Sequence, residues 1–149
     1  LRIGDWRSSL RYAALYGGVT IPLIVLASRW ADFQGYYSRY LHSEQEPWVI
    51  ALALGGWVLY FFAWEFHYRG FLLFALEPRF GVFAIAIQTI PFTMTHFGKP
   101  WPETASAIIA GVALGWWALR TRSFLGPWLL HWVCSALMQI SVAFWPASS

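Results

Sequence analysis

Ionisable side chains stand inside long apolar stretches of this sequence, where a bilayer tolerates them poorly. Glu65 and Arg69 are four residues apart, so they share one helix face and can form an ion pair. His96 and His131 follow in later apolar stretches. A carboxylate beside a histidine can hold a water molecule and remove its proton, and a second histidine can donate a hydrogen bond to the oxyanion that forms. These residue types predict water-dependent hydrolysis of a peptide bond, with Arg69 keeping Glu65 ionised.

Other residues extend this set or leave alternatives open. Ser135 lies four residues after His131 and therefore on the same helix face. His67 points away from the ion pair, which is typical of a packing or interface residue. Neither Ser135 nor Cys134 lies in a recognisable nucleophile motif, so a serine or cysteine enzyme is disfavoured. Two histidines and a glutamate with an open position would also suit catalytic zinc, and a zinc-dependent protease is an alternative.

Composition indicates the environment in which these side chains must be placed. Of the 149 residues, 58% are hydrophobic and 11% charged, against roughly 45–50% and about 25% in soluble domains. The single cysteine excludes a disulfide scaffold, and the apolar content excludes a disordered chain. Lysines and arginines are scattered without a basic run, so we expect no nucleic-acid partner. The composition predicts an integral membrane protein with the lipid bilayer as its partner.

Apolar stretches define the elements that would position the candidate residues. We expect an all-α, polytopic transmembrane helix bundle of about five spans, forming one integral-membrane domain over residues 1–149. The expected spans cover about 12–28, 48–76, 82–96, 104–119 and 125–145. Pro91 predicts a kink or an end in the third. A chain that begins at Leu1 is also compatible with further helices upstream.

The charges between the spans predict their orientation. With the N-terminus inside, the outer segments contain few basic residues, set among acidic ones. The inner segments contain Arg2, Arg7, Arg11, Arg79, Arg120 and Arg122. The positive-inside rule therefore predicts a cytoplasmic N-terminus.

Depth in the bilayer brings the candidate residues together. At a rise of about 1.5 Å per residue, Glu65 lies roughly 16 Å from Leu76, the inner end of its span. By the same count His96 lies roughly 21 Å, and His131 roughly 9 Å, from the inner ends of their spans. All three fall in the middle of a hydrocarbon core about 30 Å thick. We therefore expect them to converge.

Three motifs in this order give the sequence a family resemblance. They are Glu-Phe-His-Tyr-Arg-Gly at 65–70, Phe-Thr-Met-Thr-His at 92–96 and His-Trp-Val-Cys-Ser at 131–135. These resemble the E-E-x-x-x-R-G, F-x-x-x-H and H-x-x-x-N/D motifs of the CAAX protease and bacteriocin-processing family of intramembrane glutamic endopeptidases. The resemblance covers a catalytic core of about residues 57–138.

The resemblance implies roles for the matched residues. In this family a glutamate and the first histidine, here His96, activate water, while the second, here His131, stabilises the oxyanion with its partner at Ser135. It implies that neither a metal nor another cofactor is required. It also implies a prokaryotic plasma-membrane enzyme that cleaves a membrane-borne or lipidated protein, or a C-terminal tail.

Two positions depart from the family pattern. Trp64 occupies the position of the first glutamate, to which the family's base is usually assigned. Adjacent helix positions differ by about 100° in direction, so Glu65 can replace that base only after a local rotation. Ser135 is shorter than the asparagine or aspartate of the family. These departures favour an alternative, a catalytically inactive membrane scaffold or bacteriocin-immunity protein on the same fold.

A second acid follows the second motif. The stretch from His96 to Glu103 resembles an H-x-G-K-P-x-x-E extension found in some bacterial branches of the family. We hypothesise that Glu103 folds over the site, either as a second acid or as a partner for Lys99. As an alternative, Glu103 is a first-turn helix charge that the helix dipole favours.

Overall fold

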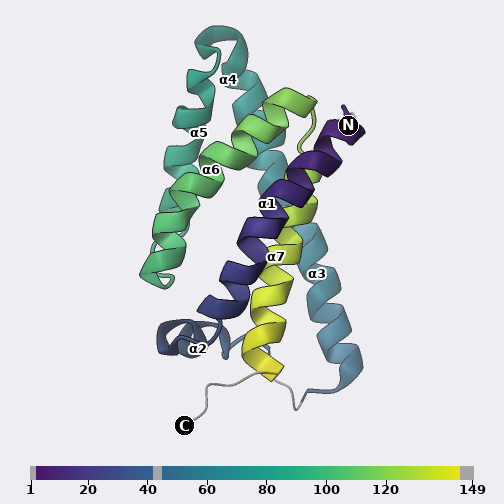
Figure 1. Cartoon of the computed structure of the whole chain (residues 1–149), viewed down its shortest axis with the longest axis vertical. Coiled ribbons are helices and arrows are strands. Elements are labelled where there is room, and N and C mark those ends of the chain that lie inside the picture. The colour runs from purple at the N-terminus through teal and green to yellow at the C-terminus, as the bar shows by residue number, and fades with distance from the viewer. Residues whose placement is uncertain (1–2, 42–44, 145–149) are drawn as a thin grey trace.

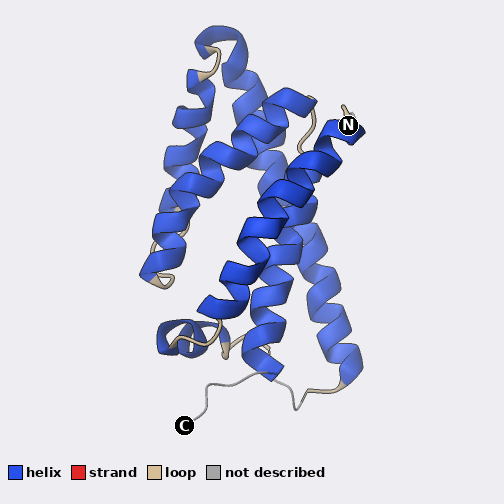
Figure 2. Cartoon of the chain, in the orientation of Figure 1, coloured by secondary structure: helices blue, strands red, loops and turns tan. Residues whose placement is uncertain are grey.

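The computed structural model describes residues 3–41 and 45–144 as a bundle of helices, without a strand in these ranges (Figure 2). The all-α prediction is confirmed. Arg2 and Trp145, the end of the expected fifth span, lie outside the described residues. The elements are α1 (Trp6–Ala27), α2 (Ala31–Tyr37), α3 (Pro47–Glu65), the π-helix η1 (Phe66–Leu72), α4 (Leu73–Phe80), α5 (Phe83–Met94), α6 (Trp101–Thr121) and α7 (Leu125–Phe144).

Each expected span corresponds to a helix. Among the described residues, three helices are long and apolar enough to cross a membrane: Trp6–Ala27, the continuous α3–η1–α4 helix Pro47–Phe80, and Leu125–Phe144. Helix α5 is apolar but only 12 residues long, and Pro91 lies three residues before its end. Helix α6 has 21 residues but is not among the three. The structure is therefore a helical membrane bundle in which α5 and α6 differ from the other expected spans.

The helices form two packed groups, which Figure 1 shows side by side. Helix α7 packs against both α1 and α3, and α2 lies against α7 at the lower end in that view. Helices α5 and α6 form a closely packed antiparallel pair. The long α3–η1–α4 helix joins the groups, because α3 contacts α7 while α4 contacts α5.

A close backbone approach holds α5 against α6. A Cβ atom built on Gly111 would lie 2.7 Å from Cγ2 of Thr89, so only glycine fits this crossing. The fully buried Gln88 donates a hydrogen bond from Nε2 to the Gly111 carbonyl oxygen at 2.9 Å. Small residues with interhelical hydrogen bonds are typical of helix packing in membranes. This crossing fixes α5, whose C-terminal end carries the second motif.

Helix α1, which packs against α7, is also hydrogen-bonded to α6 and exposes apolar side chains on its outer side. Trp117 is fully buried, and its Nε1 donates to the hydroxyl of Ser9 at 2.9 Å. On the outer side of α1, Leu15, Val19 and Leu23 are each more than half exposed. A surface of this kind is stable against lipid tails rather than water, which agrees with a membrane-spanning helix.

Candidate active site

Glu65 and Arg69 form a buried ion pair at the junction of α3 and η1. The Arg69 Nη1 atom lies 2.7 Å from Glu65 Oε1, and both side chains are completely shielded from solvent. Two charges buried in this way are stable only as a pair, since removing either partner leaves an uncompensated charge. The pairing expected from the four-residue spacing is therefore present.

His131 completes this contact from α7. Its Nδ1 atom lies 2.7 Å from the same Glu65 oxygen, Oε1. Because a carboxylate accepts hydrogen bonds, Nδ1 carries the proton in this contact, which turns Nε2 away from Glu65. The second carboxylate oxygen, Oε2, is buried and has no hydrogen-bond partner among the described residues. Glu65 thus has one oxygen fixed by two neighbours and one oxygen free to bind another group.

A π-helix begins immediately after Glu65. Its wider hydrogen bonds include one from the Leu73 N–H to the carbonyl oxygen of Tyr68, five residues earlier. A π-turn contains more residues than an α-turn and is often found at functional sites. It changes the angular relation between Glu65, which precedes it, and Arg69, which lies within it.

His96 lies in the turn that follows α5. It is 5% exposed, and its Nδ1 atom lies 2.9 Å from the carbonyl oxygen of Phe92, so Nδ1 is the protonated nitrogen and Nε2 is an available acceptor. The hydroxyl of Thr104 on α6 donates to the His96 carbonyl oxygen at 2.7 Å. Gly98 follows with a φ of 90°, a left-handed conformation that glycine adopts without strain. The hydrogen bonds to Phe92 and from Thr104 therefore hold the His96 side chain and backbone in place.

Phe92 is the apolar centre around which the polar residues gather. The Arg69 guanidinium carbon lies 3.9 Å from its ring centroid. The ring centroids of His96 and His131 lie 4.8 and 6.0 Å from that of Phe92. Trp64 closes this side, with its ring 6.2 Å from His96 in an edge-to-face arrangement. Both histidines therefore share one ring as a neighbour, although no hydrogen bond joins them in the described chain.

The sequence places Phe92 in the second motif but gives it no role. Its signal is the phenylalanine four residues before His96, a spacing that puts both side chains on one helix face.

Glu103 interacts with a different part of the molecule. Its Oε1 atom accepts a hydrogen bond from the Lys99 ammonium at 2.7 Å, and its Oε2 atom accepts one from the Tyr37 hydroxyl at 2.6 Å. Burial raises the pKa of the Tyr37 hydroxyl well above its usual value, and the negative charge of Glu103 raises it further. Within the described residues no hydrogen bond or ion pair joins Glu103 to Glu65. Tyr37 was not predicted, since nothing in its local sequence indicates a partner 66 residues away.

Ser135 is half-buried on α7, four residues after His131. Among the described residues, no hydrogen bond links its hydroxyl to Glu65, His96 or His131. His67 is exposed.

A family model matches residues 41–137 of the chain, with the description type II CAAX prenyl endopeptidase Rce1-like. The match covers about two thirds of the chain and includes all three motifs. The chain belongs to the Rce1-like family. This confirms the resemblance to CAAX-type intramembrane proteases. No curated protein and no solved structure matches the chain.

The Rce1-like motifs also raise the question of a metal ion. In the described part of the chain, no group of three histidine, cysteine, aspartate or glutamate side chains is arranged to hold one. The side chains that suggested zinc in the sequence are therefore not gathered into a three-ligand site in the described chain.

Proposed function

We propose that this Rce1-like chain is a glutamic-type intramembrane endopeptidase, which hydrolyses a peptide bond in the C-terminal tail of a membrane-borne or lipidated protein. The observation that carries this proposal is the asymmetry of Glu65. One of its oxygens is fixed by Arg69 and His131, and the other is buried without a partner in the described chain. A buried carboxylate oxygen in this state favours a hydrogen-bond donor such as the attacking water.

The first step uses the unpartnered oxygen. Water bound to Glu65 Oε2 and directed toward His96 Nε2 loses a proton to this pair, and its oxygen forms a bond to the scissile carbonyl carbon. Arg69 stays beside Glu65 throughout and supplies the positive charge that keeps the carboxylate ionised before the step. His96 is the base expected from the second motif, and its Nδ1 contact with Phe92 leaves Nε2 for this purpose.

The oxyanion of the tetrahedral intermediate requires a hydrogen-bond donor. His131 already donates from Nδ1 to Glu65, so it donates from Nε2 as well only when it is doubly protonated. Collapse of the tetrahedral intermediate breaks the C–N bond, and the proton taken from water passes to the leaving amine. Ser135 and Glu103 remain candidate residues, Ser135 as a partner of His131 and Glu103 as a second acid.

Cleavage of a defined substrate tests the proposal. The purified chain in lipid nanodiscs is incubated with a peptide that carries a farnesylated cysteine followed by three residues, and the released tripeptide is measured by mass spectrometry. We expect Glu65→Gln and His96→Gln to lower the rate by at least about 100-fold, as is typical of general-base residues. His67→Ala, at an exposed position beside the site, is the matched control and keeps the wild-type rate.

The same experiment separates the enzyme from a scaffold. Trp64 at the first-glutamate position and the unlinked Ser135 favour a catalytically inactive membrane scaffold or immunity protein. That alternative predicts no release by the wild-type chain, and release that persists in both variants would contradict the glutamic mechanism. We further propose a cytoplasmic N-terminus in a prokaryotic plasma membrane, and cysteine labelling from either side of the membrane tests this orientation.

A further inference from the structure

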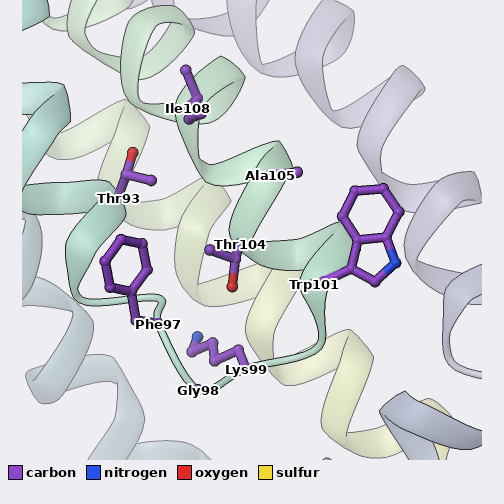
Figure 3. Close-up of a pocket in the computed structure, with 8 residues that line it drawn as sticks. All are labelled: Thr93, Phe97, Gly98, Lys99, Trp101, Thr104, Ala105 and Ile108. Atoms are coloured by element: carbon purple, nitrogen blue, oxygen red, sulfur yellow. The ribbon is translucent and has the colours of Figure 1, made fainter.

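A groove of about 490 Å³ lies between the end of α5 and the start of α6, beside the turn that carries His96 (Figure 3). Most of its walls are apolar, as the exposed rings of Phe97 and Trp101 and the side chain of Ile108 illustrate. The residues that line it are Thr93, Phe97, Gly98, Lys99, Trp101, Thr104, Ala105 and Ile108. The dimensions and apolar walls suit a short peptide with aliphatic side chains.

Lys99 gives this groove a single charge among its described lining residues. The Lys99 side chain is 27% exposed, and its ammonium group is held at 2.7 Å by Glu103, whose second oxygen accepts from Tyr37. An ammonium group has three N–H donors, so the bond to Glu103 leaves others for a ligand. Because Glu103 already holds the Lys99 side chain in one position, this side chain loses little further rotamer entropy when an anion binds to it.

Thr93 supplies a second polar group in the groove wall. Its Oγ1 atom is buried and has no hydrogen-bond partner among the described residues. A buried hydroxyl without a partner is unfavourable, and a hydrogen bond would remove this cost. The groove thus offers a cation to a polar ligand, while the Thr93 hydroxyl lies buried behind its wall.

The groove is directly connected to the candidate active site. The Lys99 backbone N–H donates to the His96 carbonyl oxygen at 3.2 Å, and Thr104, from the groove wall, donates to the same oxygen at 2.7 Å. The Cα atoms of His96 and Lys99 are therefore within about 7 Å, as in a tight turn. A tail of three extended residues spans about 10 Å. A tail whose scissile bond lies at His96 can thus end near Lys99.

We propose that this groove binds the C-terminal end of the substrate tail, with the Lys99 ammonium group recognising its free carboxylate. This inference rests on the proposed function, because it assumes a tail cleaved near His96. It adds a specificity-determining residue outside the three motifs. Glu103 and Tyr37 then act as positioning residues that hold Lys99 in the groove.

A phospholipid headgroup is the competing occupant of a cationic site at a membrane surface. Lysines that anchor a protein to lipid extend freely toward the headgroups. Lys99 instead has a partner on α6 that is itself fixed by α2. This constraint favours a ligand of defined geometry over a mobile headgroup.

Binding of a product-sized peptide tests the proposal without requiring cleavage. The full chain in detergent micelles is titrated with acetyl-Val-Ile-Leu as the free acid and as the carboxamide. We expect the wild type to bind the acid about tenfold more tightly than the amide, as for a charge-assisted hydrogen bond. Lys99→Met should reduce acid binding to the level of the amide and leave amide binding unchanged, whereas Lys99→Arg should keep the preference.

The controls define the results that would overturn the proposal. Arg79→Met removes another exposed cation, at the C-terminal end of the α3–η1–α4 helix, and should leave the acid preference intact. Equal binding of acid and amide by the wild type would overturn the proposal, as would a preference that survives in Lys99→Met. If Lys99→Met instead lowers the binding of phosphatidylglycerol, while the wild type binds both peptides equally, a lipid phosphate is the occupant. An acid preference in a chain that cleaves no farnesylated substrate would contradict only the proposed function.

Discussion

The guanidinium carbon of Arg69 lies 3.9 Å from the ring centroid of Phe92, so the buried cation rests on an aromatic face. The same ring neighbours His96 and His131. A desolvated contact of this kind contributes about 2 kcal/mol. It also supports the Arg69 end of the ion pair. The apolar residue of the second motif therefore positions charged residues from the first.

Replacing Phe92 by leucine should separate the contribution of the Arg69–ring contact from that of apolar packing. We expect Phe92→Leu to lower the free energy of unfolding by about 2 kcal/mol and to reduce cleavage of the farnesylated peptide at least about tenfold. Ile85→Ala is the control, because Ile85 is also buried but packs in a separate cluster with Leu73, Ala84 and Ala118. If both variants lose activity in proportion to their stability, Phe92 has only a packing role.

The Glu65–Arg69 pair should behave as one unit in unfolding experiments. Arg69→Met leaves a buried carboxylate without its main partner and should cost about 3–5 kcal/mol. Glu65→Gln combined with Arg69→Met removes both charges, so the double variant should lose less stability than the sum of the single variants. Denaturant unfolding in mixed micelles measures all three variants. Additive losses would show that the two side chains do not interact strongly.

Two tryptophans provide a comparison of a paired and an unpaired indole. The Nε1 atom of Trp64 is buried without a partner among the described residues, whereas Nε1 of Trp117 donates to Ser9. We expect Trp64→Phe to leave the unfolding temperature unchanged or to raise it, because it removes an unsatisfied donor and keeps an aromatic ring. Trp117→Phe should lower stability by about 1–3 kcal/mol. A larger loss for Trp64→Phe would mean that its N–H has a stabilising partner.

The Tyr37–Glu103 contact predicts a loss of stability in alkali. Burial, and next Glu103, raise the pKa of Tyr37 in the folded state. The unfolded chain therefore releases this proton first, near the usual tyrosine pKa of about 10. The contribution of Tyr37 is complete below that pH and is lost progressively as the pH rises above it. Tyr37→Phe should flatten this part of the stability profile between about pH 9 and 11, and an unchanged profile would contradict the predicted linkage.

Local spacing and helix rise were sufficient to predict the centre of the candidate site. The interval between Glu65 and Arg69 predicts their pairing in any α-helix. Counting residues from the inner span ends predicts that Glu65 and His131 lie at similar depth, and in the structure their side chains touch. Apolarity and the motif order likewise predicted the helical membrane bundle and the family.

The remaining features depend on energies that local sequence does not contain. The π-helix at Phe66–Leu72 replaces better α-helical bonds, so only packing with neighbouring helices can favour it. Tyr37 contacts Glu103 because α2 folds back under the bundle, in a segment where the sequence predicted no element. The five expected spans also assumed that apolar stretches cross the bilayer, whereas α5 ends after 12 residues and leads into the His96 turn.

The wide turn after Glu65 has a mechanical consequence for the longest helix. A straight α-helix from Pro47 to Phe80 would present one continuous stripe to the bundle, yet its first half contacts α7 and its last half contacts α5. The π-helix rotates the contact face of α4 relative to that of α3, so one continuous helix packs against two separate neighbours. One residue deleted from this segment would restore ordinary winding and turn α4 by about 100° relative to α3. The length of this segment, as well as its residue types, is therefore constrained.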